Sequence, residues 1–140
     1  MVGDELIQAA IIEKLKSIPS ITVVVPSTEI KEIYWQGDTF TFPNIRVDLE
    51  SNEWAFDEQE RCQLQYAEFS IYVFSEERSS KQCSQIKTII LNALSGIGFT
   101  STTHQVKFSR LRLVDNVPAV RQDERTWRSQ VKFGSRITSS

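Results

Sequence analysis

The side chains of this chain that could act in catalysis begin with its one histidine, His104, and its two cysteines, Cys62 and Cys83. A serine or cysteine nucleophile needs a histidine within hydrogen-bonding reach, so any such site would have to use His104. His104 falls among Ser and Thr at the expected start of a strand, and no nucleophile-elbow sequence is present. One histidine and two separated cysteines also fall short of a four-ligand zinc site. We therefore expect a surface histidine, reduced and partly buried thiols, and no catalytic, cofactor or metal site.

A second group that could do chemistry is an acidic cluster. Its members are Asp48, Glu50, Glu53, Asp57, Glu58 and Glu60. Gathered carboxylates can bind a divalent metal, as in a nuclease, and Glu68 is expected to approach them from the next strand. A restriction-type nuclease centre also needs a lysine two residues beyond a carboxylate on the following strand. The one Glu-x-Lys sequence, at 29–31, precedes the cluster instead. A solvated or channel-facing acidic surface is the favoured interpretation.

Basic residues are concentrated at the other end of the chain. Residues 1–100 contain 8 Lys and Arg against 15 Asp and Glu (net −7), whereas residues 101–140 contain 8 against 3 (net +5). The basic residues there are Lys107, Arg110, Arg112, Arg121, Arg125, Arg128, Lys132 and Arg136. Two interpretations stay open. Neighbouring strands pair opposite charges within one chain, or acidic and basic flanks of different copies meet head to tail, a contact that can close into a ring.

Regularly spaced arginines also suit nucleic acid. A sheet that stacks bases exposes aromatic rings among its cations. We expect Trp127 and Phe133 on the face opposite Arg128 and Lys132, which argues against sequence-specific binding and leaves weak electrostatic contact open.

Two helices are expected to support these residues. The first should run from about Asp4, as its cap, to Ile18, with Pro19 ending it. Its apolar stripe would be Leu6, Ile7, Ala10, Ile11, Leu15 and Ile18. The second should begin near Ser79, which has the spacing of a capping box with Gln82, and stop at Gly96. Its stripe would be Cys83, Ile86, Ile90, Ala93, Leu94 and Ile97.

Five strands are expected, over residues 21–25, 44–51, 62–75, about 106–113 and 127–133. The long segment 26–43 suggests a hairpin turning at 36–38, and residues 52–61 an acidic loop. A change of alternation near Ser109 indicates a β-bulge.

The strand 62–75 is the most informative, because it is apolar on both faces. Ala67, Phe69, Ile71 and Val73 alternate onto one face, and Tyr66, Tyr72 and Phe74 onto the other. A helix can cover one face. The second would need more of this chain or another copy of it.

The bulk properties predict one domain, residues 1–140, of the α+β class. It should have a mainly antiparallel sheet, the order α-β-β-β-α-β-β, and two helices packed on the sheet. The chain is 40% hydrophobic and 24% charged. No apolar run approaches the ~20 residues that cross a bilayer, and the acidic N-terminus is unlike a signal peptide. We expect a soluble, intracellular protein without membrane partners.

The order of elements, with the segments FSIYVFS (69–75) and IKTIILNAL (86–94) separated by a Ser-rich helix start, resembles the tail-terminator, or tail-completion, proteins of long-tailed bacteriophages. The resemblance spans nearly the whole chain. It implies a non-enzymatic ring, typically of six subunits, that sits on the end of the tail tube and halts its polymerisation. The ring also joins the tail to the head while genome DNA passes through it without sequence-specific binding.

The resemblance further implies assembly in the bacterial cytoplasm, a place in the virion tail or neck, and three kinds of protein partner. These are copies of itself, the tail tube protein and a neck or head-completion protein. Candidate interface residues are Trp35, Trp54, Tyr72, Phe74, Arg110, Arg112 and Arg128. Asp57, Glu58 and Glu60 are candidates for an acidic surface facing the channel or a partner, where negative charge would keep DNA from adhering. Other neck, head-closure or tail-tube components, and a small nucleic-acid-binding protein or nuclease, remain alternatives.

Overall fold

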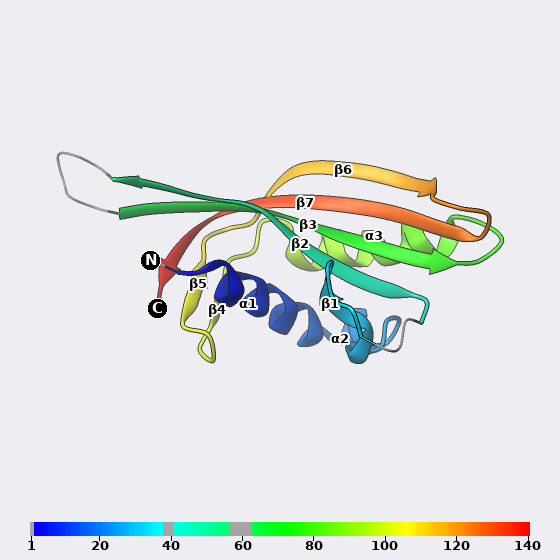
Figure 1. Ribbon diagram of the computed structural model, residues 1–140, viewed down its shortest axis with the longest axis horizontal. Helices are drawn as coiled ribbons and strands as arrows, with labels where there is room; N and C mark the ends of the chain where they lie inside the picture. The colour runs from blue at the N-terminus through cyan, green and yellow to red at the C-terminus, as the bar shows by residue number, and fades with distance from the viewer. Residues whose placement is uncertain (1, 38–40, 57–62) are drawn as a thin grey trace.

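The computed structural model describes residues 2–37, 41–56 and 63–140, and shows one sheet with its helices on one side (Figure 1). In chain order its elements are α1 (Asp4–Lys16), α2 (Pro19–Thr22), the 3-10 turn η1 (Ser27–Glu29), β1 (Ile30–Glu32), β2 (Asn44–Phe56), β3 (Gln63–Glu76), α3 (Lys81–Leu94), β4 (Phe99–Ser101), β5 (Val106–Phe108), β6 (Arg112–Arg121) and β7 (Thr126–Ser139). The predicted α+β class is confirmed.

Three long antiparallel strands, β2, β3 and β7, form the centre of the sheet. The strand order is β1-β2-β3-β7-β5-β4, and β6 also pairs with β7. β1 runs parallel to β2, so the sheet is mixed instead of purely antiparallel. β5 and β6 pair with successive parts of β7, which leaves β6 as an outer strand beside it.

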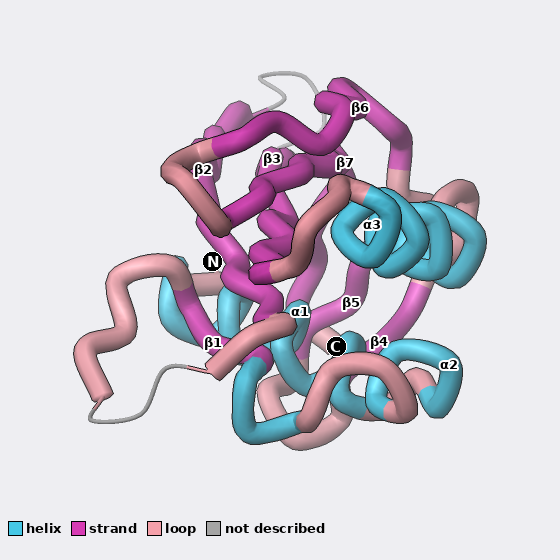
Figure 2. Tube along the Cα trace, turned by 90° about the vertical axis from the view of Figure 1, so that its right-hand side faces the viewer, coloured by secondary structure: helices cyan, strands magenta, loops and turns pink. Residues whose placement is uncertain are grey.

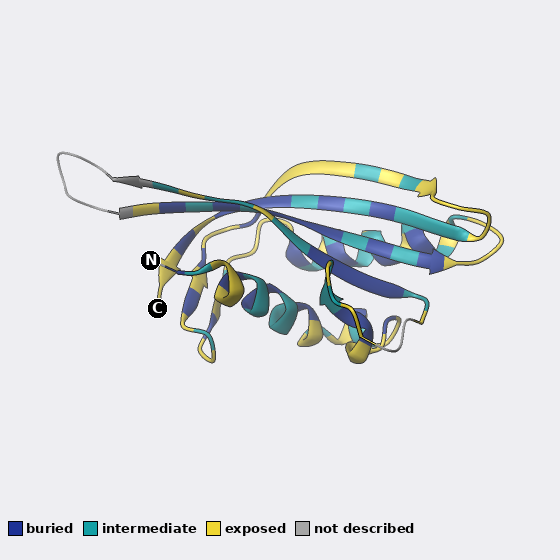
Figure 3. Cartoon of the chain, in the orientation of Figure 1, coloured by how far each residue is buried: buried dark blue, intermediate teal, exposed yellow. Residues whose placement is uncertain are grey.

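The core lies between the sheet and the helices (Figures 2 and 3). The sheet contributes Ala67, Phe69, Ile71, Val73, Val131 and Phe133, and the helices contribute Ile7, Ala10, Ile11, Leu15, Cys83, Ile86, Ile90 and Leu94, all buried. The ring of Phe69 lies 6.0 Å from that of Phe133 and 6.4 Å from that of Phe108. Both helical stripes and the alternation of β3 are therefore confirmed at their centres, whereas Leu6 and Ile97, at the ends of the stripes, are exposed.

The expected strand at 21–25 is wrong. Residues Pro19–Thr22 form the short helix α2, with Pro19 at the start, where its missing N–H costs nothing. Ile21 and Val25 are both buried at helical spacing, so tertiary packing overrides the β-branched composition. The first helix is also shorter than predicted, because it ends at Lys16, and its cap is Gly3 instead of Asp4.

The expected hairpin within 26–43 is also wrong. Residues 30–32 form β1, which pairs in parallel with β2, and residues 33–35 of the expected first arm are not a strand. The N–H of Ile33 continues this contact by donating to the carbonyl of Val47 at 2.9 Å. Residues 38–40 of the predicted hairpin lie outside the described residues.

Strand β2 continues to Phe56, five residues beyond the predicted end at Ser51. The register of the β2–β3 ladder shifts between Leu49 and Ser51, so Glu50 interrupts the alternation that marks the strand in the sequence. The expected loop at 52–61 is therefore a strand over its first part, and residues 57–62 lie outside the described residues.

Helix α3 differs from the prediction at its start and agrees with it at its end. Ser80 is the N-cap and makes no side-chain cap hydrogen bond, so the predicted capping box of Ser79 and Gln82 does not form. Gly96 follows the helix with φ of +76°, the conformation expected of a glycine stop.

The irregularity predicted near Ser109 is present but is larger than a bulge. Phe108 pairs with Ile137 and Arg112 with Gly134, so residues 109–111 leave the ladder. After this break β6 continues to Arg121, a strand of ten residues that the expected element order does not contain. Its residues are almost all exposed (Figure 3). The side chains therefore show no half-buried alternation from which a strand could be predicted.

Candidate functional site

The face of the sheet opposite the helices is the candidate site. We call it the open face and define it by side chains of four strands: Asp48, Glu50, Tyr66, Glu68, Ser70, Tyr72, Phe74, Arg112, Arg128, Gln130 and Lys132. Residues paired across neighbouring strands lie on the same face of a sheet, and the pairs Tyr72–Gln130, Ser70–Lys132 and Phe74–Arg128 bring β3 and β7 together here. In Figure 1 all three helices lie on the other side.

Lys132 occupies the centre of the acidic part of this face. Its Nζ lies 2.7 Å from Oε2 of Glu50 and 3.3 Å from Oε2 of Glu68. The Ser70 hydroxyl donates to Glu50, and the Gln130 amide donates to Ser70 at 2.8 Å. The predicted approach of Glu68 to the acidic cluster is confirmed, and Lys132 lies between the carboxylates of Glu50 and Glu68.

The pKa values of Glu50 and Asp48 are shifted in opposite directions. Burial works to raise the pKa of Glu50, but the hydrogen bonds from Lys132 and Ser70 and the charge of Lys132 outweigh it, so the pKa is lowered. The pKa of Lys132 is raised by its hydrogen bonds to Glu50 and Glu68. The pKa of Asp48 is raised, first by burial and then by the charges of Glu50 and Glu32. For Lys132, the interpretation that opposite charges pair between neighbouring strands of one chain is correct.

Aromatic rings accompany the arginines of the open face. Tyr72 and Phe74 are stacked, with ring centroids 6.3 Å apart, and the Arg128 guanidinium lies 5.6 Å from the Tyr72 ring. Arg112 lies 5.9 Å from the Tyr66 ring and donates to its hydroxyl at 2.7 Å. The two arginines thus contact rings, a cation–π arrangement.

As expected, Trp127 and Phe133 lie on the face of β7 opposite Arg128 and Lys132. Other aromatic rings, however, lie on the face of these cations. Phe133 is buried on the helical face. The Trp127 indole donates to the carbonyl of Glu77 at 3.1 Å and lies under Arg121. The aromatic residues that share a face with the cations are those of β3. Predicting that these rings lie beside Arg128 would require the register between β3 and β7, and the sequence alone does not give that register.

Trp35 covers a buried ion pair at the edge of the sheet. Arg46 is 3% and Glu29 4% exposed. Arg46 Nη2 lies 3.6 Å from Glu29 Oε2, and Nη1 donates to the Glu29 carbonyl at 2.6 Å. Burial lowers the pKa of Arg46, while Glu29 opposes this. The Trp35 ring lies 5.9 Å from Arg46 and 5.0 Å from Lys31, so within one chain Trp35 closes a local contact.

The other predicted interface residues are dispersed. Trp54 lies half-buried on β2 beyond the bulge, paired with Gln65. Arg110 is exposed between β5 and β6. Asp57, Glu58 and Glu60 lie outside the described residues.

The residues with nucleophilic or metal-binding potential do not form a site in the described part of the chain. His104 is half-buried, with Nε2 3.1 Å from Oε2 of Glu13 on α1. Cys83 is buried, and burial raises the pKa of its thiol. Among the described residues, no group of three or more His, Cys, Asp or Glu could hold a metal ion.

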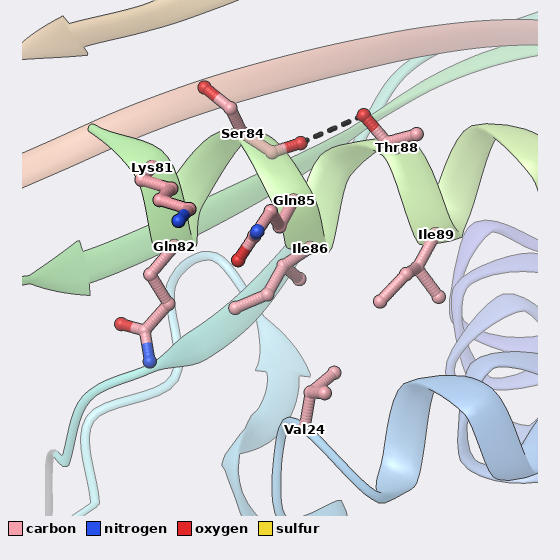
Figure 4. Close-up of a pocket in the computed structure, with 8 residues that line it drawn as sticks. All are labelled: Val24, Lys81, Gln82, Ser84, Gln85, Ile86, Thr88 and Ile89. Atoms are coloured by element: carbon pink, nitrogen blue, oxygen red, sulfur yellow. Dashed lines mark hydrogen bonds between the residues drawn. The ribbon is translucent and has the colours of Figure 1, made fainter.

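A groove of about 770 Å³ lies on the helical side (Figure 4). Val24 lines it from one wall, facing Ile86 and Ile89 of α3. The polar lining residues are Lys81, Gln82, Ser84, Gln85 and Thr88. Lys81 is the one titratable residue among these lining residues.

Within the described residues, no helix has the length and apolar character required to cross a bilayer. No protein-family model matches the chain, and no curated protein matches it. Twelve chains of solved structures match its fold, among them the following two. One is a chain from the virion of the native gene transfer agent particle, with a TM-score of 0.68 and 17% identity over 93% of this chain and 92% of that one. The other has a TM-score of 0.67 and 14% identity over 100% of this chain and 99% of that one.

Proposed function

We propose that this protein is a structural component of a phage-like virion that forms a ring on the end of the tail tube. The ring ends tube polymerisation and joins the tail to the head or neck while DNA passes through. The observation that carries the proposal is the shared fold with a chain of the gene transfer agent virion, which extends over nearly the full length of both chains. The resemblance of residues 69–75 and 86–94 to tail-terminator proteins points in the same direction.

The shape of the molecule supports this role. One face of the sheet carries the helices (Figure 1). The other is the open face, where charged side chains lie beside Tyr72 and Phe74. Copies placed side by side in a ring would present the open face to one side and the helices to the other. The outer strand β6 and the far part of β2 leave surface for neighbouring copies.

The decisive experiment mixes the purified protein with preformed tail tubes and images them by negative-stain electron microscopy. We expect density at one tip of each tube and a halt to further growth when tube protein is added. Binding along the tube wall, or self-polymerisation into tubes, would instead identify a tube relative. Bare tips at saturating protein would exclude the terminator role.

The acidic residues between β2 and β3 provide the first prediction. If Asp57, Glu58 and Glu60 face the channel, replacing all three with Asn or Gln should slow DNA passage, because DNA then adheres to a less negative wall. Ring formation should be unchanged. Ejection kinetics measure the effect, with neutralisation of Glu5, Glu77 and Glu124 as the matched control. Unaltered ejection in the triple variant would count against a channel position.

The open face also favours one alternative, a nucleic-acid-binding module. Tyr66, Tyr72 and Phe74 lie among the arginines Arg112 and Arg128, as on sheets that stack bases. Glu50, Glu68 and Asp48 share the face and oppose a polyanion. Tight DNA binding that falls steeply with salt would support this alternative over the ring.

A further inference from the structure

β6 and β2 flank the central strands β3 and β7 on opposite sides, and their outer edges differ in how well they are protected from pairing with another chain. Proteins protect exposed strand edges with prolines, bulges and lysines, because an open edge pairs with other chains. On β6, Pro118 lacks an N–H, and Lys87 of α3 donates to the carbonyl of Val117 at 3.3 Å. The β6–β7 register shifts in both halves of β6, between Leu113 and Asp115 and between Val117 and Val120. The second half of β6 is thus protected by a proline and a lysine contact that the first half lacks.

The edge of β2 is covered only over its first residues. β1 pairs with Ile45, Arg46 and Val47, and no other described strand pairs with the outer edge of β2 up to Phe56. Beyond the pair Tyr66–Arg136, β7 no longer accompanies β3, so β2 and β3 continue as a two-stranded arm (Figure 1). A ribbon of two strands is only marginally stable by itself and gains from a third strand.

The protected part of β6 and the part of β2 that β1 covers lie in the same rows of paired residues across the sheet. One row of paired residues runs across it through Val117, Gln130, Tyr72, Arg46 and Lys31. The protected part of β6 is therefore level with the part of β2 that β1 already covers. A second row runs through Arg112, Gly134, Glu68 and Ser51. The start of β6, which has no such proline or lysine contact, is therefore level with the uncovered edge of β2.

We propose, resting on the ring function above, that the start of β6 (Arg112–Asp115) pairs with the uncovered edge of β2 in the next copy. The strands β2, β3, β7 and β6 alternate in direction. Side by side around an axis, β6 therefore meets the neighbouring β2 antiparallel, and the sheet continues from copy to copy. Every open face then points to the same side of the ring, and every helix to the other.

Charge selects the register of this contact. Without stagger, Asp115 would face Asp48 of the next copy, since both lie in the row of Ser70 and Lys132. Like charges directly opposite each other destabilise a sheet. A stagger of two residues toward the arm keeps the faces aligned, and strand tilt in a closed sheet requires such a stagger. It places Arg112 opposite Glu53, which is exposed. Because the irregularity between Leu113 and Asp115 adds one residue to β6, Asp115 then lies opposite Ser51.

A two-fold dimer pairs like edges, β6 with β6 or β2 with β2, and so leaves the other edge of each copy uncovered. A second copy in head-to-tail arrangement is thus the occupant that satisfies both edges.

The test is a cross-link between Glu53→Cys and Arg112→Cys in a Cys62→Ser chain, oxidised on tube tips and at high protein concentration. Within one chain the two positions are separated by β3 and β7, about 14 Å at the usual strand spacing. This exceeds the reach of a disulfide, so the linkage can only join copies. We expect a ladder of covalent oligomers on a non-reducing gel. The matched control is Glu53→Cys with Arg121→Cys, at the protected end of β6, which should give no ladder.

The charge swap provides a second test that does not depend on disulfide geometry. Arg112→Glu or Glu53→Arg alone should weaken self-association more than about tenfold, and the double swap should restore it. Arg121→Glu, whose side chain also lies over an aromatic ring, should have little effect. Circular dichroism checks that each variant folds.

The outcomes separate this inference from the proposed function. Caps on tubes without a ladder overturn the β6–β2 contact and leave the function standing. A ladder without caps supports the contact and overturns the function. A control ladder as strong as the test ladder, or no ladder and no caps, overturns the contact.

Discussion

At the residue scale, the charged side chains of this protein are held by two kinds of partner. Carboxylates hold Lys132 and Arg46. Aromatic rings hold Arg112, Arg121 and Arg128. The uneven charge of the sequence is therefore partly resolved within one chain at β2, β3 and β7, while the arginines of β6 keep their charge at the surface.

The buried pair of Arg46 and Glu29 gives a prediction for stability. Arg46→Ala should lower the free energy of unfolding by about 3–5 kcal/mol, because it leaves the Glu29 carboxylate buried without its cation. Urea denaturation measures the change. Lys31→Ala is the matched control, since Lys31 contacts the same indole from a less buried position. Equal losses in the two variants would contradict the importance of the buried pair.

Asp48 and Glu50 should show opposite dependence on pH. The pKa of Glu50 is lowered, so its stabilising contribution is present at neutral pH and is lost as the pH falls through that lowered pKa. The pKa of Asp48 is raised, so its ionised form costs stability at neutral pH. At pH 7 Glu50→Gln should therefore destabilise and Asp48→Asn stabilise, each by less than about 1 kcal/mol for these partly solvated groups.

Thermal unfolding across the acid range measures both effects. In strong acid both variants should approach the wild type, because the carboxyl groups are then protonated in the folded and unfolded states. A shift of the same sign in both variants at neutral pH would contradict the assignment.

At the element scale, helix α3 is fixed at its end by backbone geometry and along its length by packing. Gly96 has φ of +76°, and its N–H donates to the carbonyl of Leu111 at 2.9 Å, which ties the helix end to the start of β6. Ile86, Ile90 and Leu94 face the sheet. The position of β6 thus depends on how α3 terminates.

Gly96→Ala tests this termination. A Cβ at Gly96 would meet no neighbouring atom within 4 Å, so the cost is that of the left-handed backbone alone. We expect a loss of about 1–2 kcal/mol in unfolding free energy, measured by urea denaturation. Ser95→Ala, at the exposed preceding residue, should change stability by less than about 0.5 kcal/mol. A neutral Gly96→Ala variant would show that the turn accepts another conformation.

At the scale of the whole molecule, burial is one-sided. The core fills the space between sheet and helices, while the opposite face is polar and β6 exposes Leu113, Val114 and Val120 at 41%, 41% and 42% (Figure 3). That another copy completes the second face of β3 stays a prediction. Tyr72 and Phe74 are half-buried, and the residues paired with them on β7 are the polar Gln130 and Arg128.

Salt should act on assembly more than on folding. If acidic β2 and basic β6 meet between copies, self-association should weaken at about 1 M salt, where the Debye length is only about 3 Å. The monomer should keep its unfolding midpoint, because its core is apolar. Sedimentation velocity with parallel denaturation curves measures the two quantities. Stronger association at high salt would point to an apolar contact instead, for example at the groove beside Val24.

The sequence by itself determined the elements whose side chains alternate between buried and exposed. The stripe of α3, the alternation of β3 and β7 and the Gly96 stop follow from local periodicity, which the hydrophobic core enforces residue by residue. Tertiary structure decided the rest. Residues 19–22 are helical because packing overrides β-branched propensity, and β1 pairs in parallel through a contact distant in sequence. β6 is almost wholly exposed, so its sequence lacks the alternation of apolar and polar residues from which a strand is predicted.

The open face shows the same limit. Lys132 meets Glu50 and Glu68, and the arginines meet the rings of β3, only because strand register brings residues far apart in the chain to one row. Register is set by the summed packing of the whole sheet, so no local segment of the sequence contains it.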